Sequence, residues 1–149
     1  MPHNYNQFPE LTNKQIEEFG FTSPHKQIVE DFNATVVKVH DGDTITLRTT
    51  FRDFDFPLRV LDIDAKELNE GGETAREWLK SQIEQKEIMV IMNRKNRVGK
   101  YGRLLGKVLH NGLDMGEAML TLGLVQPFGQ KNEGEPEPLD KVFSIKQWF

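Results

Sequence analysis

Residues 33–49 have the sequence NATVVKVHDGDTITLRT, in which two runs rich in β-branched side chains flank Asp41-Gly42-Asp43. β-Branched residues favour strands, and an Asp-Gly pair between two such runs favours a tight hairpin. We therefore expect strands over residues 33–40 and 44–49. Three further strands are expected over residues 54–63, 87–92 and 103–110.

Two helices are expected after the third and the fifth strand. Residues 73–83 carry their apolar side chains at helical spacing. Asp114 is expected to cap a second helix that runs to Leu122, with Glu117 completing a capping box and Gly123 following its end. The order of three strands, a helix, two strands and a helix predicts an α+β fold, a five-stranded OB-type β-barrel with helices packed outside.

The two ends of the chain differ in composition from its middle. Residues 1–32 are polar, and Thr12-Asn13-Lys14-Gln15 has the form of a capping box that could open a short helix to Phe19. Residues 131–149 are rich in glutamate and proline in their first half and end in apolar and aromatic residues. We predict a polar extension over residues 1–32, an OB-fold domain over 33–130 and a C-terminal tail over 131–149.

The composition excludes several classes of protein. The chain of 149 residues contains no cysteine, so disulfides and thiolate metal sites are excluded. No apolar run approaches the ~18–20 residues of a membrane span, so no membrane partner is expected. The first residues lack a basic start followed by an apolar stretch. A cytoplasmic location is therefore favoured, with secretion as the alternative if a signal has been removed.

The charges are unevenly distributed along the chain. Nineteen Lys and Arg residues against 23 Asp and Glu residues leave a net charge of −4, which is unusual for a protein that coats DNA. One short stretch nevertheless contains no acid and carries five basic residues: Arg94, Lys95, Arg97, Lys100 and Arg103. Such a run is often only a solvated loop. If Arg103 binds a phosphate, however, the run predicts a basic rim on an otherwise acidic protein.

Five ionisable residues occur at spacings that suit one site: Asp43, Arg59, Asp64, Glu67 and Arg103. Asp43 ends the Asp-Gly-Asp turn, and Arg103 follows a glycine-flanked loop. Asp64 lies five residues after Arg59, and Glu67 lies eight residues after it. Two carboxylates can bind a hard cation, a third can handle a water, and two guanidinium groups can bind a phosphate. The set predicts a site that cleaves phosphodiesters.

Other interpretations of these residues remain open. Asp43 could serve only the turn, and Arg59 could form a structural ion pair with a nearby acid. Strict alternation along a strand would place Arg59 and Asp64 on opposite faces, so they converge only if the strand bends or ends near Ile63. Asp62 is an equally acidic alternative to Asp64.

From about Asn33 to about Val125, these motifs resemble those of staphylococcal nuclease-like (thermonuclease) domains. The resemblance implies that Asp43 and Asp64 bind Ca²⁺ together with the main-chain carbonyl of Ala65. It also implies that Glu67 orients or deprotonates the attacking water. The family usually has Thr and Pro where this chain has Ala65-Lys66.

The resemblance also implies which residues bind the substrate. Arg59 and Arg103 correspond to the two catalytic phosphate-binding arginines, and Lys100 and Tyr101 to residues that hold a second phosphate. The basic loop would add Arg94, Lys95 and Arg97. The pair of tyrosines that flanks the base in the family is absent, and only Phe128 could stack there.

The expected function is that of a calcium-dependent nuclease that hydrolyses DNA, RNA or both. Single strands are the expected preference, since an OB-type groove suits unpaired backbone. Two other classes are possible. One is a non-catalytic OB-fold module that binds nucleic acid or protein. The other is an accessory protein of a phage or larger complex, in which the two ends dock an unknown protein partner.

Overall fold

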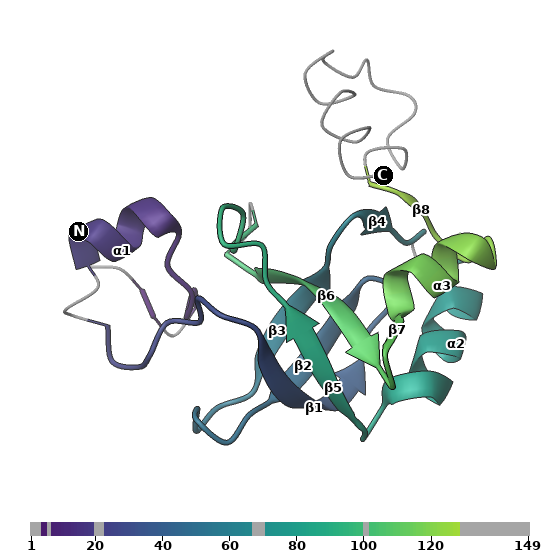
Figure 1. Cartoon of the computed structure of the whole chain (residues 1–149), viewed down its shortest axis with the longest axis horizontal. Coiled ribbons are helices and arrows are strands. Elements are labelled where there is room, and N and C mark those ends of the chain that lie inside the picture. Colours follow the sequence, from purple (N-terminus) through teal and green to yellow (C-terminus); the bar gives the residue numbers. More distant parts are fainter. Residues whose placement is uncertain (1–3, 6, 20–22, 67–70, 100–101, 129–149) are drawn as a thin grey trace, which may run out of the picture.

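The computed structural model describes residues 4–5, 7–19, 23–66, 71–99 and 102–128 (Figure 1). The helices are α1 (Asn13–Phe19), α2 (Glu73–Ile83) and α3 (Met115–Thr121). The strands are β1 (Phe32–Val39), β2 (Thr44–Arg48), β3 (Phe56–Val60), β4 (Ile63–Asp64), β5 (Glu87–Ile91), β6 (Leu104–His110), β7 (Leu113–Asp114) and β8 (Gln126–Pro127).

Strands β1, β2, β3, β5 and β6 form a closed mixed β-barrel (Figure 1). Antiparallel pairs join β1 to β2 and β5, β2 to β3, and β5 to β6. β3 and β6 close the barrel in parallel, with Leu58 opposite Leu104 and Val60 opposite Gly106. The prediction of a five-stranded OB-type barrel in an α+β fold is confirmed.

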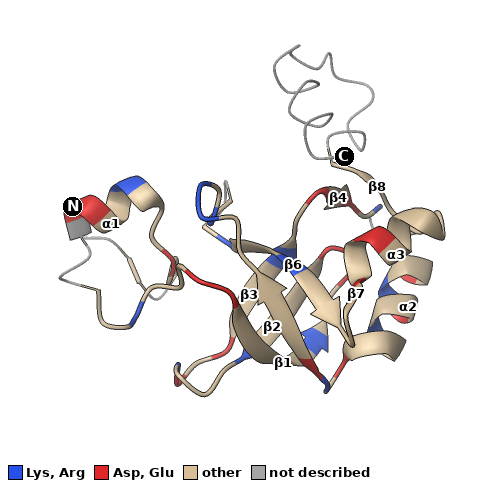
Figure 2. Ribbon diagram, viewed as in Figure 1, with Lys and Arg blue, Asp and Glu red and all other residues tan. Residues whose placement is uncertain are grey.

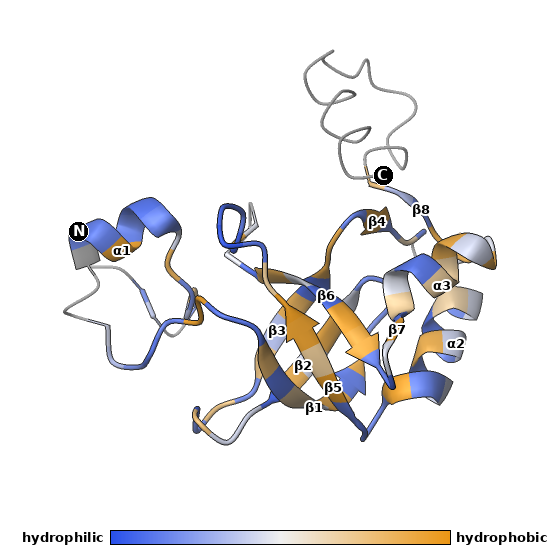
Figure 3. Cartoon of the chain, viewed as in Figure 1, coloured by the Kyte–Doolittle hydropathy of each residue, from blue (hydrophilic) through white to orange (hydrophobic). Residues whose placement is uncertain are grey.

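The barrel interior is filled by alternate side chains of its strands. Ile45 and Leu47 of β2, Leu58 of β3, Val90 of β5 and Leu104 of β6 are completely inaccessible to solvent. This alternation of buried and exposed positions is expected for strands with one face on a core. Figure 3 shows hydrophobic positions along the barrel strands, interrupted by hydrophilic ones, and α1 as mostly hydrophilic.

The expected helices are present. α2 spans the predicted residues and buries Ala75, Leu79 and Ile83 against the barrel. Asp114 caps α3 by accepting a hydrogen bond from the N–H of Glu117 at 3.1 Å. The helix ends at Thr121, one residue before the predicted end. None of the helices in the described ranges is long and apolar enough to cross a membrane.

The prediction of one strand over residues 54–63 is wrong. β3 covers only Phe56–Val60, and the chain turns before β4 begins at Ile63. The turn contains Asp62, whose φ of 70° lies in the left-handed region that non-glycine residues rarely adopt. β4 then leaves the barrel sheet and pairs with β8. The other strands agree with their predicted bounds to within one residue at each end.

The N-terminal extension is bound to the barrel. Its helix α1 begins with the expected capping box, in which Thr12 and Gln15 each accept a hydrogen bond from the other's backbone N–H. Leu11 is completely buried, and Ile28 joins the hydrophobic core of the barrel. The polar composition of residues 1–32 therefore conceals apolar anchors.

A buried cluster of charges fastens the extension. Glu10 forms an ion pair with Arg52, whose guanidinium carbon lies 4.6 Å from the ring centroid of Phe56. Arg97 contributes a second guanidinium, with Nη2 at 3.9 Å from Glu10 Oε2. All three charged side chains are almost completely buried. Since an unpaired charge is very costly in such surroundings, Glu10 is the anion that both arginines require.

Candidate functional site

Three of the sequence-predicted residues meet at one end of the barrel. Nη2 of Arg59, on β3, lies 2.5 Å from Oδ1 of Asp64 and 3.5 Å from Oδ2 of Asp43. Asp64 belongs to β4, and Asp43 immediately precedes β2. All three side chains are mostly buried. The two carboxylates thus surround a single positive charge in a region with little solvent.

The turn after β3 makes this meeting possible. Because β3 ends at Val60 and Asp62 adopts a left-handed backbone, Asp64 reaches the side on which Arg59 lies. The turn is held at both ends: the N–H of Val60 donates to the carbonyl of Asp43, and the N–H of Phe128 donates to the carbonyl of Asp62. Pairing with β8 then fixes Asp64 in place.

The turn at residues 41–44 holds Asp43 from several sides. Oδ2 of Asp43 accepts the N–H of Ala65 at 2.9 Å, and Oδ1 accepts the hydroxyl of Thr44 at 3.0 Å. Gly42 allows the turn to pack closely, since a Cβ there would lie 2.8 Å from the Cβ of Ala75 on α2. Any larger residue would push the turn away from Ala65.

Arg103, which lies just before β6, reaches the same turn. Its Nη1 donates to the hydroxyl oxygen of Thr44 at 3.1 Å, and that hydroxyl in turn donates to Asp43. Thr44 therefore joins the second arginine to the carboxylate pair. The sequence analysis did not single out Thr44 as a site residue, although it belongs to the same Asp-Gly-Asp-Thr motif.

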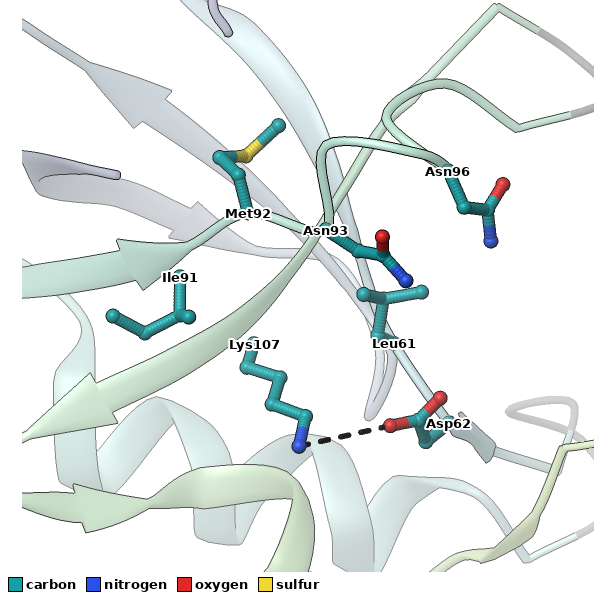
Figure 4. A pocket seen from close by; sticks show the side chains of 7 residues that line it. All are labelled: Leu61, Asp62, Ile91, Met92, Asn93, Asn96 and Lys107. Carbon is teal, nitrogen blue, oxygen red and sulfur yellow. Dashed lines mark ion pairs between the residues drawn. The ribbon is translucent and has the colours of Figure 1, made fainter. Parts of the chain in front are cut away.

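Asp62 points away from this group. Figure 4 shows its carboxylate directed toward Lys107 of β6, with Oδ2 at 4.0 Å from the ammonium nitrogen. Both residues line a pocket of about 220 Å³ that also contains Asn93 and Asn96. Burial raises the pKa of Asp62, with Asp114 adding to the shift and Lys107 opposing it. Of the two acids left open by the sequence, only Asp64 contacts Arg59.

The model for the staphylococcal nuclease homologue family matches residues 57–143, which is more than half of the chain. The chain belongs to this family. The matched region includes Arg59, Asp64 and Arg103, whereas Asp43 lies before it. A search of curated proteins found no match. Members of the staphylococcal nuclease homologue family are generally nucleases, and the closed barrel of this member is the fold expected of one.

The basic loop of this family member contains residues with different environments. Figure 2 shows basic residues gathered on the loop after β5, where Arg94 and Lys95 are exposed. Arg97 is buried, and it donates to the carbonyls of Ile28 and Leu11. A guanidinium enclosed in this way cannot reach a phosphate, so the assignment of Arg97 to substrate binding is corrected.

Three predicted residues lie outside the described part of the chain: Glu67, Lys100 and Tyr101. Phe128 is described, and its ring centroid lies 6.0 Å from the guanidinium carbon of Arg59. An aromatic side chain therefore lies beside the carboxylate group, although the tyrosine pair of the staphylococcal nuclease family is missing.

The oxygen donors at this site suit a hard cation. Among the described residues, no group of three or more His, Cys, Asp or Glu side chains is arranged to hold a metal ion. The predicted set instead combines the carboxylates of Asp43 and Asp64 with the main-chain carbonyl of Ala65. Both carboxylates already approach one cationic nitrogen of Arg59. Carboxylate and carbonyl oxygens are the type of ligand that hard cations take.

Asp41, a second residue that the sequence analysis did not include, modifies the charge of Asp43. Burial raises the pKa of Asp43, but a hydrogen bond from Asp41, the charge of Arg59 and the N–H of Ala65 together lower it below 3.8. Burial raises the pKa of Asp41 from 3.8 to about 6, and the hydrogen bond to Asp43 and the negative charge of Asp43 add to this shift. At neutral pH the Asp43 carboxylate is therefore available as an anion.

These pKa shifts predict how Asp41 affects stability. Between about pH 4 and pH 6, Asp41 is protonated in the folded chain and ionised in the unfolded chain. Its contribution to the free energy of unfolding therefore falls as pH rises through this window. Asp41→Asn keeps the acceptor for the Asp43 N–H. In chelator at pH 7.5 the variant should unfold at higher urea concentration, with a gain of at most about 1 kcal/mol after solvent screening.

The gain should be much smaller at pH 4, where Asp41 is protonated in the folded chain and is already partly protonated in the unfolded chain. Asp53→Asn, which removes an exposed acid from the loop between β2 and β3, is the control and should show no such trend. A gain in Asp41→Asn that is the same at pH 4 and at pH 7.5 would contradict the assignment.

Proposed function

We propose that this chain is a calcium-dependent phosphodiesterase that hydrolyses DNA, RNA or both. The observation that supports this most directly is the approach of Asp43 and Asp64 to Arg59, with Arg103 joined to them through Thr44. Such a set combines the anions that a cation requires with the cations that a phosphate requires. Family membership supports the same reaction class.

In this proposal Asp43, Asp64 and the carbonyl of Ala65 hold the calcium ion. When bound, calcium would supply the charge that polarises a phosphate oxygen and increases the acidity of a water. Glu67 would orient that water or accept its proton, a role that rests on the resemblance alone.

The arginines meet the charge that develops during the reaction. Attack on phosphorus increases the negative charge on the non-bridging oxygens, and a guanidinium can bind two such oxygens at once. Arg59 is largely shielded from solvent, which strengthens any contact that it makes with a phosphate. Arg103 approaches from the segment just before β6, so the two groups can bind a phosphate from different segments of the chain.

Substrate binding is proposed to depend on a small basic surface. Arg94 and Lys95 are exposed on the loop after β5, and Lys100 and Tyr101 follow them in the sequence. Because the net charge is −4, affinity should be modest and should fall steeply with salt. Unpaired strands are the proposed substrates, since their backbone can follow an OB-type surface.

The decisive experiment is cleavage of heat-denatured DNA and of RNA by the full chain in calcium, repeated with an excess of chelator. We expect cleavage in calcium only, with products that carry a 5′-hydroxyl and a 3′-phosphate. Cleavage that survives complete chelation would overturn the calcium mechanism. Absence of cleavage in both conditions would overturn the nuclease.

One observation favours a second candidate, a non-catalytic module that binds nucleic acid or protein. Arg59 is held by Asp64, by Asp43 and by the carbonyl of Val60, as a purely structural arginine would be. Retention of labelled single-stranded DNA without cleavage would support this candidate, and the termini would then be the segments to test for a protein partner.

A further inference from the structure

A cavity of about 560 Å³ lies between the N-terminal extension and the barrel. Its walls include Tyr5 and His25 from the extension, Phe54 from the segment before β3, and Arg103 from the segment just before β6. The volume is within the range of ~300–1,000 Å³ that is usual for sites of small organic ligands. Arg103 thus faces both this cavity and the turn that carries Asp43.

Aromatic rings form one side of the cavity. The ring centroids of Tyr5 and His25 are 6.0 Å apart, and those of His25 and Phe54 are 4.9 Å apart, both in edge-to-face arrangements. His25 is fixed in this cluster because its Nε2 donates to the carbonyl of Pro9 at 2.7 Å. Rings held in this way are typical surfaces for nucleobases in proteins that bind single strands.

The charges of the cavity are separated. Asp53 contributes an exposed carboxylate to its lining, Asp55 contributes one that Arg48 holds in a two-point ion pair, and Arg103 contributes a guanidinium. Carboxylates repel a phosphate, but they accept hydrogen bonds from the amino groups of bases. A nucleotide would therefore lie with its phosphate at Arg103 and its uncharged base toward the aromatic and acidic walls.

The extension is in direct contact with the chain just before Arg103. Gly102 has a φ of 75°, and a Cβ there would lie only 2.6 Å from Cδ1 of Phe8. The close packing of Phe8 on Gly102 fixes the cavity wall relative to the guanidinium. The extension is thus placed where it can contact the nucleotide whose phosphate Arg103 binds.

We infer that the extension completes a nucleobase subsite beside Arg103, formed by Tyr5, His25 and Phe54 with Asp53. The inference rests on the proposed function insofar as Arg103 binds a substrate phosphate. Guanine suits the subsite well, because its imino and amino groups are neighbouring donors and a carboxylate can accept a hydrogen bond from each. The subsite would provide the stacking surface that the missing tyrosine pair does not.

The test measures binding in the absence of cleavage. The full chain is titrated in chelator with guanosine 3′,5′-bisphosphate and, separately, with the corresponding sugar bisphosphate that lacks a base. Ring resonances of Tyr5 and His25 are followed by NMR. We expect the nucleotide to shift both sets of resonances and to bind at least about fivefold more tightly than the baseless compound.

Tyr5→Ala should remove most of this difference and leave affinity for the baseless compound unchanged. Phe51→Ala is the matched control, since Phe51 is 45% exposed and lies outside the cavity. It should bind the nucleotide as the wild type does. Thermal unfolding of both variants shows whether either substitution disturbs the fold, and His25 shifts in the wild type test the subsite without any substitution.

The outcomes separate this inference from the proposed function. Equal affinity for both compounds, or a nucleotide that shifts Phe128 but neither Tyr5 nor His25, would overturn the subsite even if the chain cleaves DNA. Conversely, ring shifts in a chain that cleaves nothing in calcium would sustain the subsite and overturn the nuclease.

Discussion

Asp64→Ala is expected to lower calcium-dependent cleavage by at least about 10²-fold, whereas Asp62→Ala should lower it only slightly. The two acids are close in sequence, but Asp64 contacts Arg59 beside Asp43, while Asp62 faces Lys107. Loss of groups that merely orient metal ligands costs about 10–100-fold, so loss of a ligand should cost more. Initial rates on denatured DNA at saturating calcium measure the effect.

Asp62→Ala is the matched control for this comparison, because it removes the same charge from the same segment. Calcium binding by calorimetry, with a nucleotide bisphosphate present, should be weakened only in Asp64→Ala. Thermal unfolding in chelator should show that both variants remain folded. If both substitutions reduced cleavage equally, the position of the proposed metal site would be wrong.

Glu10→Ala is expected to lower the free energy of unfolding by about 3–5 kcal/mol, the usual cost of breaking a buried ion pair. Without Glu10, the guanidinium groups of Arg52 and Arg97 would remain buried with no described carboxylate close to them. For a chain of this length, such a loss corresponds to a fall in melting temperature of about 10 °C. Urea and thermal unfolding measure both quantities.

Glu17→Ala is the control for this prediction, since it removes an exposed acid from α1 in the same extension. It should change the free energy of unfolding by no more than about 0.5 kcal/mol. A Glu10→Ala variant as stable as Glu17→Ala would mean that solvent reaches the cluster of Glu10, Arg52 and Arg97. The ion pairs of this cluster would then not hold the extension on the barrel.

Local patterns were sufficient to predict much of the fold. The bounds of α2, the hairpin of β1 and β2 and the cap at Asp114 depend on residues close in sequence, and the structure has them as expected. The strand predicted over residues 54–63 failed for a non-local reason. Asp62 is held in its left-handed turn partly by the N–H of Phe128, a residue far along the chain.

The position of Arg97 shows the same limit. A run of basic residues predicts a charged surface, but it does not show which side chain turns inward. The carbonyl partners of Arg97 belong to Leu11 and Ile28, in an extension whose composition gave no sign that it packs on the barrel. The acidic and basic residues of the site were identifiable by spacing, whereas the supporting hydroxyl of Thr44 required the three-dimensional arrangement.

The parallel pairing of β3 with β6 has a consequence for biosynthesis. Arg59 lies on β3 and Arg103 just before β6, so the two guanidinium groups come together only when Leu58 is placed opposite Leu104. Pairings between segments so distant in sequence form late, because a long loop must close first. A chain still emerging from the ribosome would therefore lack the complete pair of arginines that we propose to bind phosphate. The proposed phosphodiesterase activity should therefore appear only after the barrel has closed.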